Sequence, residues 1–198
     1  GEQPKDKKYI KLNTNENPYP PSPRVLDVIS NSANGSLRLY PDPECIELRM
    51  AIAKYNGLNE KQVFTGNGSD EILAFAFMAF FNPGNPIFFP EITYSFYPVY
   101  CNIFNINYKT IPLDTAYSIE IEKFFDKNGG IIFPNPNAPT GKVLSLQSIK
   151  DILIHNKESI VMMKLTLILE ENLLYSLLIN LIIYWLYKLF LSHAPLQE

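Results

Sequence analysis

The sequence is poor in the residues that build metal sites and disulfide frameworks. Its 198 residues include only two cysteines and two histidines. Cys45 and Cys101 show no metal-ligand spacing with His155 and His193, and two cysteines cannot make a disulfide framework. We therefore predict a protein of a reducing, cytoplasmic compartment that has no metal site.

A dense run of positive charge and a secretion signal are also lacking. The 17 lysines and arginines are offset by 20 aspartates and glutamates and form no cationic stripe, which argues against a nucleic-acid partner. The first residues, GEQPKDKKYIKLN, contain no apolar core of a secretory signal. With 46% apolar residues the chain has an ordinary globular composition, and it is long enough for one sizeable domain and too short for two full ones.

Short apolar segments alternate with helix-like segments over most of the chain. The predicted strands are QVFT (62–65), PIFFP (86–90), NYKTIPL (107–113), GGIIFP (129–134) and ESIVMM (158–163). The predicted helices between them are EILAFAFMAFF (71–81), TYSFYPVYCNIF (93–104), SIEIEKFFDKN (118–128) and SLQSIKDILIHN (145–156). This alternation predicts an α/β fold with a mostly parallel sheet covered on both faces.

Two further helices are predicted nearer the N-terminus. Ser22 followed by Pro23 has the pattern of an N-cap with proline in the first turn, ahead of an apolar face. Asp42 followed by Pro43 repeats this pattern, and Gly57 ends the run that follows.

The turn GNGSDE (66–71) lies where a predicted strand passes into a helix. Gly66 and Gly68 allow close approach of a ligand to the backbone, and free N–H groups at a helix start bind anions. Gly68, Ser69 and Asp70 could therefore hold a phosphate. The alternative is a glycine turn whose serine and aspartate serve only as helix caps.

The segment NPNAPTG (135–141) forms a rigid polar loop directly after the GGIIFP strand. Ligands of doubly wound sheets bind at the carboxyl ends of the strands, and a cis X–Pro bond here could aim an asparagine into the site. The alternative is an ordinary proline-rich turn.

The segment LNTNENPYPPSP (12–23) is too rich in proline for regular structure. It is either a flexible extension or an ordered arm whose Asn side chains and Tyr19 contact a ligand or another subunit. Tyr40 and Tyr94, each taken alone, are better explained by packing than by contact with a ligand.

Taken together, these segments resemble histidinol-phosphate aminotransferase, a pyridoxal-phosphate enzyme family of the fold-type-I aminotransferases. The resemblance covers residues 8–161 and rests on five segments in this order: LNTNENPYPPSP, YPDPECIELRMAIAKYNGL, TGNGSDEIL, PEITYSFY and NPNAPTG. It implies a homodimer that exchanges an amino group between histidinol phosphate and 2-oxoglutarate, or between the keto form and glutamate. The threonine-phosphate decarboxylases share the scaffold and supply the alternative chemistry.

The resemblance also assigns roles to particular residues. Gly68, Ser69 and Asp70 would hold the cofactor phosphate, and Tyr94 would stack on the pyridine ring. Tyr40 would reach a phosphate across the dimer interface, Tyr19 would face the substrate, and Asn137 would bind the phenolic oxygen of the cofactor, because Ala138 stands where many relatives have a second asparagine. The implied organisation is an N-terminal arm (1–35), a partial cofactor-binding large domain forming an α/β/α sandwich (36–161) and an aberrant tail (162–198).

The tail is apolar and lacks motifs that the family requires. Residues 173–191 have Lys188 as their only charge, which is compatible with a membrane anchor or with a buried helix. The family has an Asp-Glu-Ala-Tyr stretch after the strand that matches ESIV, and later a Ser-Lys pair whose lysine forms the Schiff base with the cofactor. Neither motif is written in residues 162–198.

A shifted reading frame restores both motifs. Joining the last base of each codon to the first two of the next turns Met162-Met163 into aspartate and Met163-Lys164 into glutamate, and permits alanine and tyrosine next. The same frame permits Ser-Lys across Phe190, Leu191 and Ser192. We therefore expect an out-of-frame tail and an inactive chain as written, with a non-catalytic, tail-anchored protein as the alternative.

Overall fold

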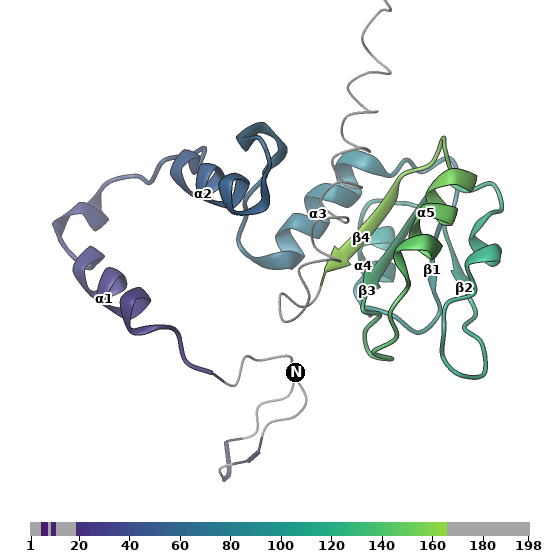
Figure 1. The fold of residues 1–198 in the computed structure, drawn as a ribbon, viewed down its shortest axis with the longest axis horizontal. Coiled ribbons are helices and arrows are strands. Elements are labelled where there is room, and N and C mark those ends of the chain that lie inside the picture. Colours follow the sequence, from purple (N-terminus) through teal and green to yellow (C-terminus); the bar gives the residue numbers. More distant parts are fainter. Residues whose placement is uncertain (1–4, 8, 11–18, 166–198) are drawn as a thin grey trace, which may run out of the picture. The chain divides into compact units, whose positions relative to one another are not determined.

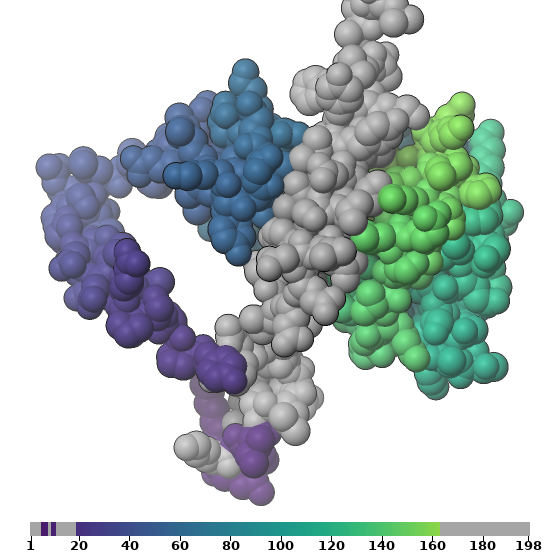
Figure 2. Space-filling model, viewed as in Figure 1, coloured from purple at the N-terminus to yellow at the C-terminus, as the bar shows by residue number. Residues whose placement is uncertain are grey.

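The computed structural model describes residues 5–7, 9–10 and 19–165, and the remaining residues are drawn in grey in Figure 1. The chain divides into two compact units. The units are Gly1–Cys45 and Ile46–Glu198. In Figure 2 the atoms coloured teal to green, which belong to the second unit, form one closely packed body. The predicted tail segment 173–191 lies outside the described residues. Within them, no helix combines the length and the apolar character needed to cross a bilayer.

The first unit contains helix α1 (Pro23–Ser32) and the 3-10 helix η1 (Gly35–Arg38). As predicted, Ser22 caps α1: its side chain accepts a hydrogen bond from the Val25 N–H at 3.4 Å, and Pro23 opens the first turn. No residue of α1 is buried.

Helix α2 (Ile46–Asn56) begins later than the sequence predicts. The Asp42 carboxylate accepts a hydrogen bond from the Glu44 N–H at 3.0 Å, which closes a turn instead of capping a helix. Cys45 then adopts a left-handed conformation with φ of 48°, so the helix starts only after it. Gly57 ends the helix as expected, at φ of 65°.

Four parallel strands form the sheet of the second unit, in the order β2-β1-β3-β4. The strands are β1 (Ile87–Pro90), β2 (Tyr108–Ile111), β3 (Gly130–Asn135) and β4 (Val161–Leu165). Ile87 is paired with Tyr108 on one side and Gly130 on the other, and Ile131 is paired with Val161. The predicted parallel sheet is thus confirmed for four of its five strands.

Side chains of the strands alternate between two apolar cores, one on each face of the sheet. Ile87, Phe89 and Ile132 pack with α3 (Gly68–Phe80) and α4 (Tyr97–Ile103). Phe88, Ile131 and Phe133 pack with the 3-10 helix η3 (Ile121–Phe124) and with α5 (Leu146–His155). Successive strand residues therefore point to opposite faces, and each face is covered by helices. This is the layered α/β/α arrangement that the sequence predicts.

The predicted QVFT strand is absent from the described part of the chain. Residues 60–62 form the 3-10 helix η2 (Glu60–Gln62), and the guanidinium of Arg49 donates to the carbonyl oxygens of Val63 and Glu60, each at 3.0 Å. A side chain therefore binds the Val63 carbonyl oxygen, a group of the predicted strand that a neighbouring strand would have used. The segment 118–128, predicted as a helix, forms only the short η3.

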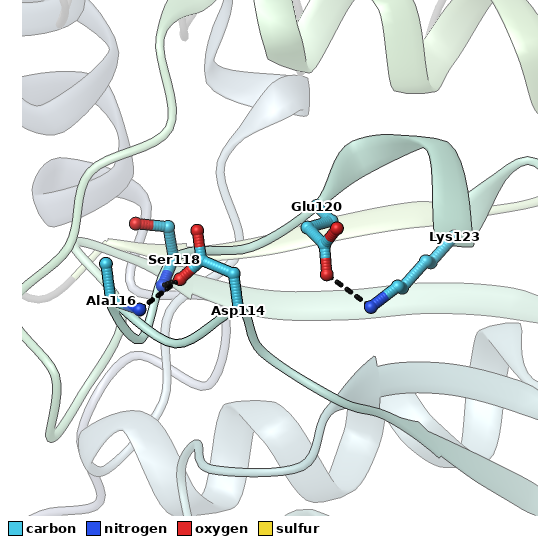
Figure 3. Close-up of polar contacts among 5 residues, drawn as sticks. All are labelled: Asp114, Ala116, Ser118, Glu120 and Lys123. Carbon is cyan, nitrogen blue, oxygen red and sulfur yellow. Dashed lines mark hydrogen bonds and ion pairs between the residues drawn. The ribbon is translucent and has the colours of Figure 1, made fainter.

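The loop between β2 and η3 is held by one aspartate (Figure 3). The Asp114 carboxylate accepts hydrogen bonds from the N–H groups of Ala116 and Ser118 at 2.8 and 2.7 Å. A few residues on, Lys123 and Glu120 form an exposed ion pair. The first contact satisfies two backbone donors, whereas the second joins two solvated charges.

We expect Asp114→Ala to lower the free energy of unfolding by about 1 kcal/mol, because it removes the acceptor of two loop N–H groups. Glu120→Ala is the matched control in the same loop, and its cost should stay within about 0.5 kcal/mol. Urea unfolding of the two variants measures both values. Equal costs would show that the loop does not depend on Asp114.

Candidate functional site

The candidate site lies where the order of the strands reverses. After β1 the chain runs to β2 on one side of it and then returns to β3 on the other side. The carboxyl ends of β1 and β3 therefore border the crevice in which parallel sheets bind ligands. Residues 91–96 follow β1 and residues 136–141 follow β3, and both segments contain motifs that the sequence marks as functional.

Helix α3 begins at Gly68 with its first turn open. Gly68 has φ of +82°, and no atom lies within 4 Å of where its Cβ would stand. The side chain of Asn67, at the N-cap position, makes no capping hydrogen bond. The backbone N–H groups of a helix start, together with the positive end of the helix dipole, suit an anion. The open first turn thus fits the predicted phosphate site at Gly68, Ser69 and Asp70.

Gly66 packs closely against side chains of the first turn of this helix. A Cβ at Gly66 would lie 2.7 Å from Ile72 Cδ1 and 2.8 Å from Glu71 Oε2. That Glu71 oxygen accepts a hydrogen bond from the Asn67 N–H at 2.6 Å. Residues 66 and 67 are therefore held by Glu71, which belongs to the first turn of α3. The space around Gly68 stays open.

Tyr94 reaches the same helix start from the loop after β1. Its hydroxyl donates to Asp70 Oδ1 at 2.5 Å, and the Tyr100 hydroxyl donates to the Asp70 carbonyl oxygen at 3.1 Å. Burial, and then the hydrogen bond to the Asp70 carboxylate and its negative charge, raise the pKa of Tyr94 far above its ordinary value. The Tyr94 hydroxyl accordingly keeps its proton and serves as a donor.

Asn137 is bound to the same loop from the side of β3. Its Nδ2 donates to the Ile92 carbonyl oxygen at 2.9 Å and to Thr140 Oγ1 at 3.1 Å, while the Thr93 hydroxyl donates to its Oδ1 at 2.8 Å. Asn137 is only 1% exposed. Its whole amide is therefore engaged by protein groups.

The NPNAPTG loop is closed by its own asparagines. Asn135 Nδ2 donates to the Leu144 carbonyl oxygen at 3.2 Å, and the Leu144 N–H donates back to Asn135 Oδ1 at 2.9 Å. The Asn137 N–H donates to the Lys142 carbonyl oxygen at 2.7 Å. The Asn135–Pro136 and Ala138–Pro139 peptide bonds are both cis, the isomer that the sequence analysis considered for this loop.

The structure thus brings the start of α3, Tyr94 and Asn137 together through residues 92–94. Tyr19 and Tyr40 belong to the first unit, where their side chains are exposed, and their part in a site stays a prediction. Sequence reasoning missed Thr93, Tyr100 and Thr140. For Thr93 and Thr140 the only available signal is that each lies in a motif already singled out.

A cavity of about 450 Å³ opens beside the helix start. Gly68 and Ser69 line it together with Thr65 and Gly66, and the remaining lining residues are apolar: Leu48, Ile52, Phe64, Ile72, Leu73, Ala76 and Met162. Neither Tyr94 nor Asn137 lines this cavity. The site as a whole offers an anion position at α3 and an aromatic ring beside it.

The chain is similar to known aminotransferases along most of its length. The sequence profile of the family described as aminotransferase class I and II matches residues 7–163. Histidinol-phosphate aminotransferase of Clostridium acetobutylicum is 58% identical over 161 residues, which are 81% of this chain and 46% of the relative. The chain therefore spans about half the length of the curated relatives that it matches.

Two solved structures show the same fold at low sequence identity. Histidinol-phosphate aminotransferase from Sinorhizobium meliloti, in complex with pyridoxal-5'-phosphate, superposes with a TM-score of 0.65 at 19% identity, over 72% of this chain and 40% of that chain. L-threonine-O-3-phosphate decarboxylase from Porphyromonas gingivalis has a TM-score of 0.57 at 20% identity, over 70% and 43% of the two chains. Structural likeness at this identity establishes the fold and does not distinguish the two chemistries.

We expect Asp70→Asn to lower the pKa of Tyr94, since it removes the negative charge and the charged acceptor. The pKa should remain above the ordinary tyrosine value, because burial is the larger cause and persists. NMR titration of ring-labelled tyrosines measures the change.

Glu71→Gln is the control for that titration, because Glu71 is in the same turn but accepts from Asn67. It should leave the pKa of Tyr94 nearly unchanged. Since the folded-state pKa of Tyr94 is raised, its contribution to stability is complete below the unfolded pKa and is lost as the pH rises through the folded value. Asp70→Asn should therefore also flatten the loss of stability at alkaline pH. Equal pKa values for Tyr94 in the wild type and in Asp70→Asn would contradict the contact.

Proposed function

Because the chain belongs to the class I and II aminotransferase family, we propose that it is part of a pyridoxal-phosphate-dependent aminotransferase acting on histidinol phosphate. Its fold is that of the fold-type-I aminotransferases. The observation that carries the proposal is the junction of the open α3 start with Tyr94 at the switch point of the sheet. This junction provides an anion position and an aromatic ring side by side, which matches a cofactor made of a phosphate and a pyridine ring.

Each part of the site has a task toward that cofactor. Gly68, Ser69 and Asp70 would hold its phosphate through backbone N–H groups, with the Ser69 hydroxyl as a further donor. Tyr94 would lie against the pyridine ring and is kept neutral by its raised pKa. When bound, the cofactor withdraws electrons from the substrate amine, a chemistry that no protein side chain supplies. The protein binds and orients it.

Histidinol phosphate is favoured as the amino donor because the relatives at 55–58% identity carry that name. The acceptor proposed with it is 2-oxoglutarate. The threonine-phosphate decarboxylase reading is the second candidate, supported by a solved structure of the same fold. In the proposed homodimer, Tyr40 reaches the phosphate of the partner's cofactor and Tyr19 faces the substrate. The arm, large domain and tail boundaries at 35 and 161 belong to the same proposal.

A shift of reading frame near residue 161 is also part of the proposal. The family profile matches up to residue 163, and the codons of Met162, Met163 and Lys164 give Asp-Glu in the shifted frame. The aspartate would face the ring nitrogen of the cofactor, and the lysine spanning Leu191 and Ser192 would bind it covalently. Neither residue is encoded in the frame as written.

We expect the chain as written to form no specific bond with the cofactor, because it lacks that lysine. When one base of the gene is corrected near codon 161 and the downstream sequence is restored, the encoded protein should contain this lysine and form the bond. Both proteins are mixed with pyridoxal phosphate, treated with borohydride to make any lysine–cofactor bond permanent, and digested for mass spectrometry. The corrected protein should carry the label on one lysine and convert histidinol phosphate in the presence of 2-oxoglutarate.

Three possible results distinguish the alternatives. Release of carbon dioxide from phosphothreonine by the corrected protein would favour the decarboxylase. A specific lysine label and turnover by the uncorrected chain would contradict the frameshift. Recovery of the uncorrected chain as a uniform, detergent-requiring membrane protein would favour the tail anchor.

A further inference from the structure

Tyr94 is fixed at two separate places. Its hydroxyl is held by the Asp70 carboxylate at 2.5 Å. The two residues before it are held by Asn137, which accepts from the Thr93 hydroxyl and donates to the Ile92 carbonyl oxygen. The ring also packs edge-on against Tyr97, with ring centroids 5.5 Å apart. The segment leading to Tyr94 and the tip of its side chain are thus held by two different elements, the loop after β3 and the start of α3.

The orientation of the Asn137 amide follows from its partners. The Ile92 carbonyl oxygen can only accept a hydrogen bond, so the amide atom that faces it at 2.9 Å must be Nδ2. The other amide atom is then Oδ1, and the Thr93 hydroxyl that faces it must donate. The Ile92 carbonyl group therefore determines which atom of the Asn137 amide is nitrogen and which is oxygen, and with them both contacts.

The Asn137 amide has no hydrogen left for a ligand. One Nδ2 hydrogen goes to the Ile92 carbonyl oxygen and the other to Thr140 Oγ1. The residue is 1% exposed, which places the amide behind the loop surface. A ligand oxygen could take a hydrogen only by displacing the Ile92 carbonyl oxygen or the Thr140 hydroxyl.

From this geometry we infer that Asn137 and Thr93 are positioning residues that act through Tyr94, and that Asn137 does not contact the cofactor's phenolic oxygen. Asn137 fixes the path of residues 92–93, and so sets where the Tyr94 ring lies and whether its hydroxyl meets Asp70. The ligand part of this inference rests on the proposed function. The Thr93–Asn137–Tyr94 connection itself does not.

The connection is tested first without any ligand. A tyrosine hydroxyl that donates to a carboxylate should give a downfield NMR signal when recorded at low temperature, and Asp70→Asn should remove this signal and thereby identify it. The signal should be lost in Thr93→Val and in Asn137→Ala, and kept in Thr93→Ser, which retains the hydroxyl. If Asn137→Ala does not fold, Thr93→Val decides, because it only exchanges a hydroxyl for a methyl group. An unchanged signal in Thr93→Val overturns the inference.

The ligand part compares three probes: pyridoxal 5'-phosphate, its 3-deoxy analogue and inorganic phosphate. Asn137→Ala and Thr93→Val should weaken binding of both pyridine compounds about tenfold, as expected for one lost contact. Phosphate affinity should stay within about twofold, since phosphate would be held by backbone N–H groups at the start of α3, where the turn is fixed by the Asn67–Glu71 contact and not by Tyr94. When Tyr94→Ala is already present, adding Asn137→Ala should reduce the affinity for the pyridine compounds little further, because Asn137 acts through Tyr94.

Two results would overturn the ligand part. A loss in Asn137→Ala that is confined to the compound bearing the 3-oxygen would show a direct hydrogen bond to that oxygen. Losses that extend to inorganic phosphate, or that add fully to those of Tyr94→Ala, would show general damage to the loop. If the wild type binds none of the three probes, the proposed function fails, and the ligand-free signal alone decides the connection.

Discussion

Three consecutive residues after β1, Ile92 to Tyr94, hold the two halves of the candidate site together. The Ile92 carbonyl group and the Thr93 hydroxyl bind Asn137, and the Tyr94 hydroxyl binds Asp70. These contacts join loops that are 24 to 45 residues apart in the chain. Because both Asn137 and the Asp70–Tyr94 contact depend on the same loop, a change at any of them is transmitted to the others.

The sheet explains why so short a loop can serve this purpose. β1 is flanked by β2 and β3, and its side chains are buried in two different cores. A strand buried on both faces and paired on both edges cannot shift along its axis without exposing apolar surface and breaking two hydrogen-bond ladders. The residues that leave its carboxyl end therefore start from a fixed point. Ligand-binding loops gain precision when a rigid element carries them.

Much of the fold could be predicted from local patterns. Four of the five predicted strands form, because runs such as PIFFP and GGIIFP are apolar throughout, as strands buried on both faces must be. The Ser22-Pro23 cap also forms as predicted. The predictions fail where a side chain competes for the backbone: Arg49, 14 residues away, takes the Val63 carbonyl oxygen from the QVFT segment, and Asp42 closes a local turn with Glu44 in place of capping α2. Neither contact changes the pattern of apolar and polar residues from which helices and strands are predicted.

For the site, the sequence by itself determined the types of group and where each lies along the chain. Glycines at 66 and 68, an aromatic ring at 94 and an asparagine–proline loop at 135–141 are readable because each is a local backbone or side-chain property. Only the tertiary structure decided which of these groups meet, and that Thr93 and Thr140 engage the Asn137 amide that sequence alone had left for a ligand. The reason is physical: a hydrogen bond between residues 44 apart depends on how the strands stack and in what order, and no local pattern encodes that order.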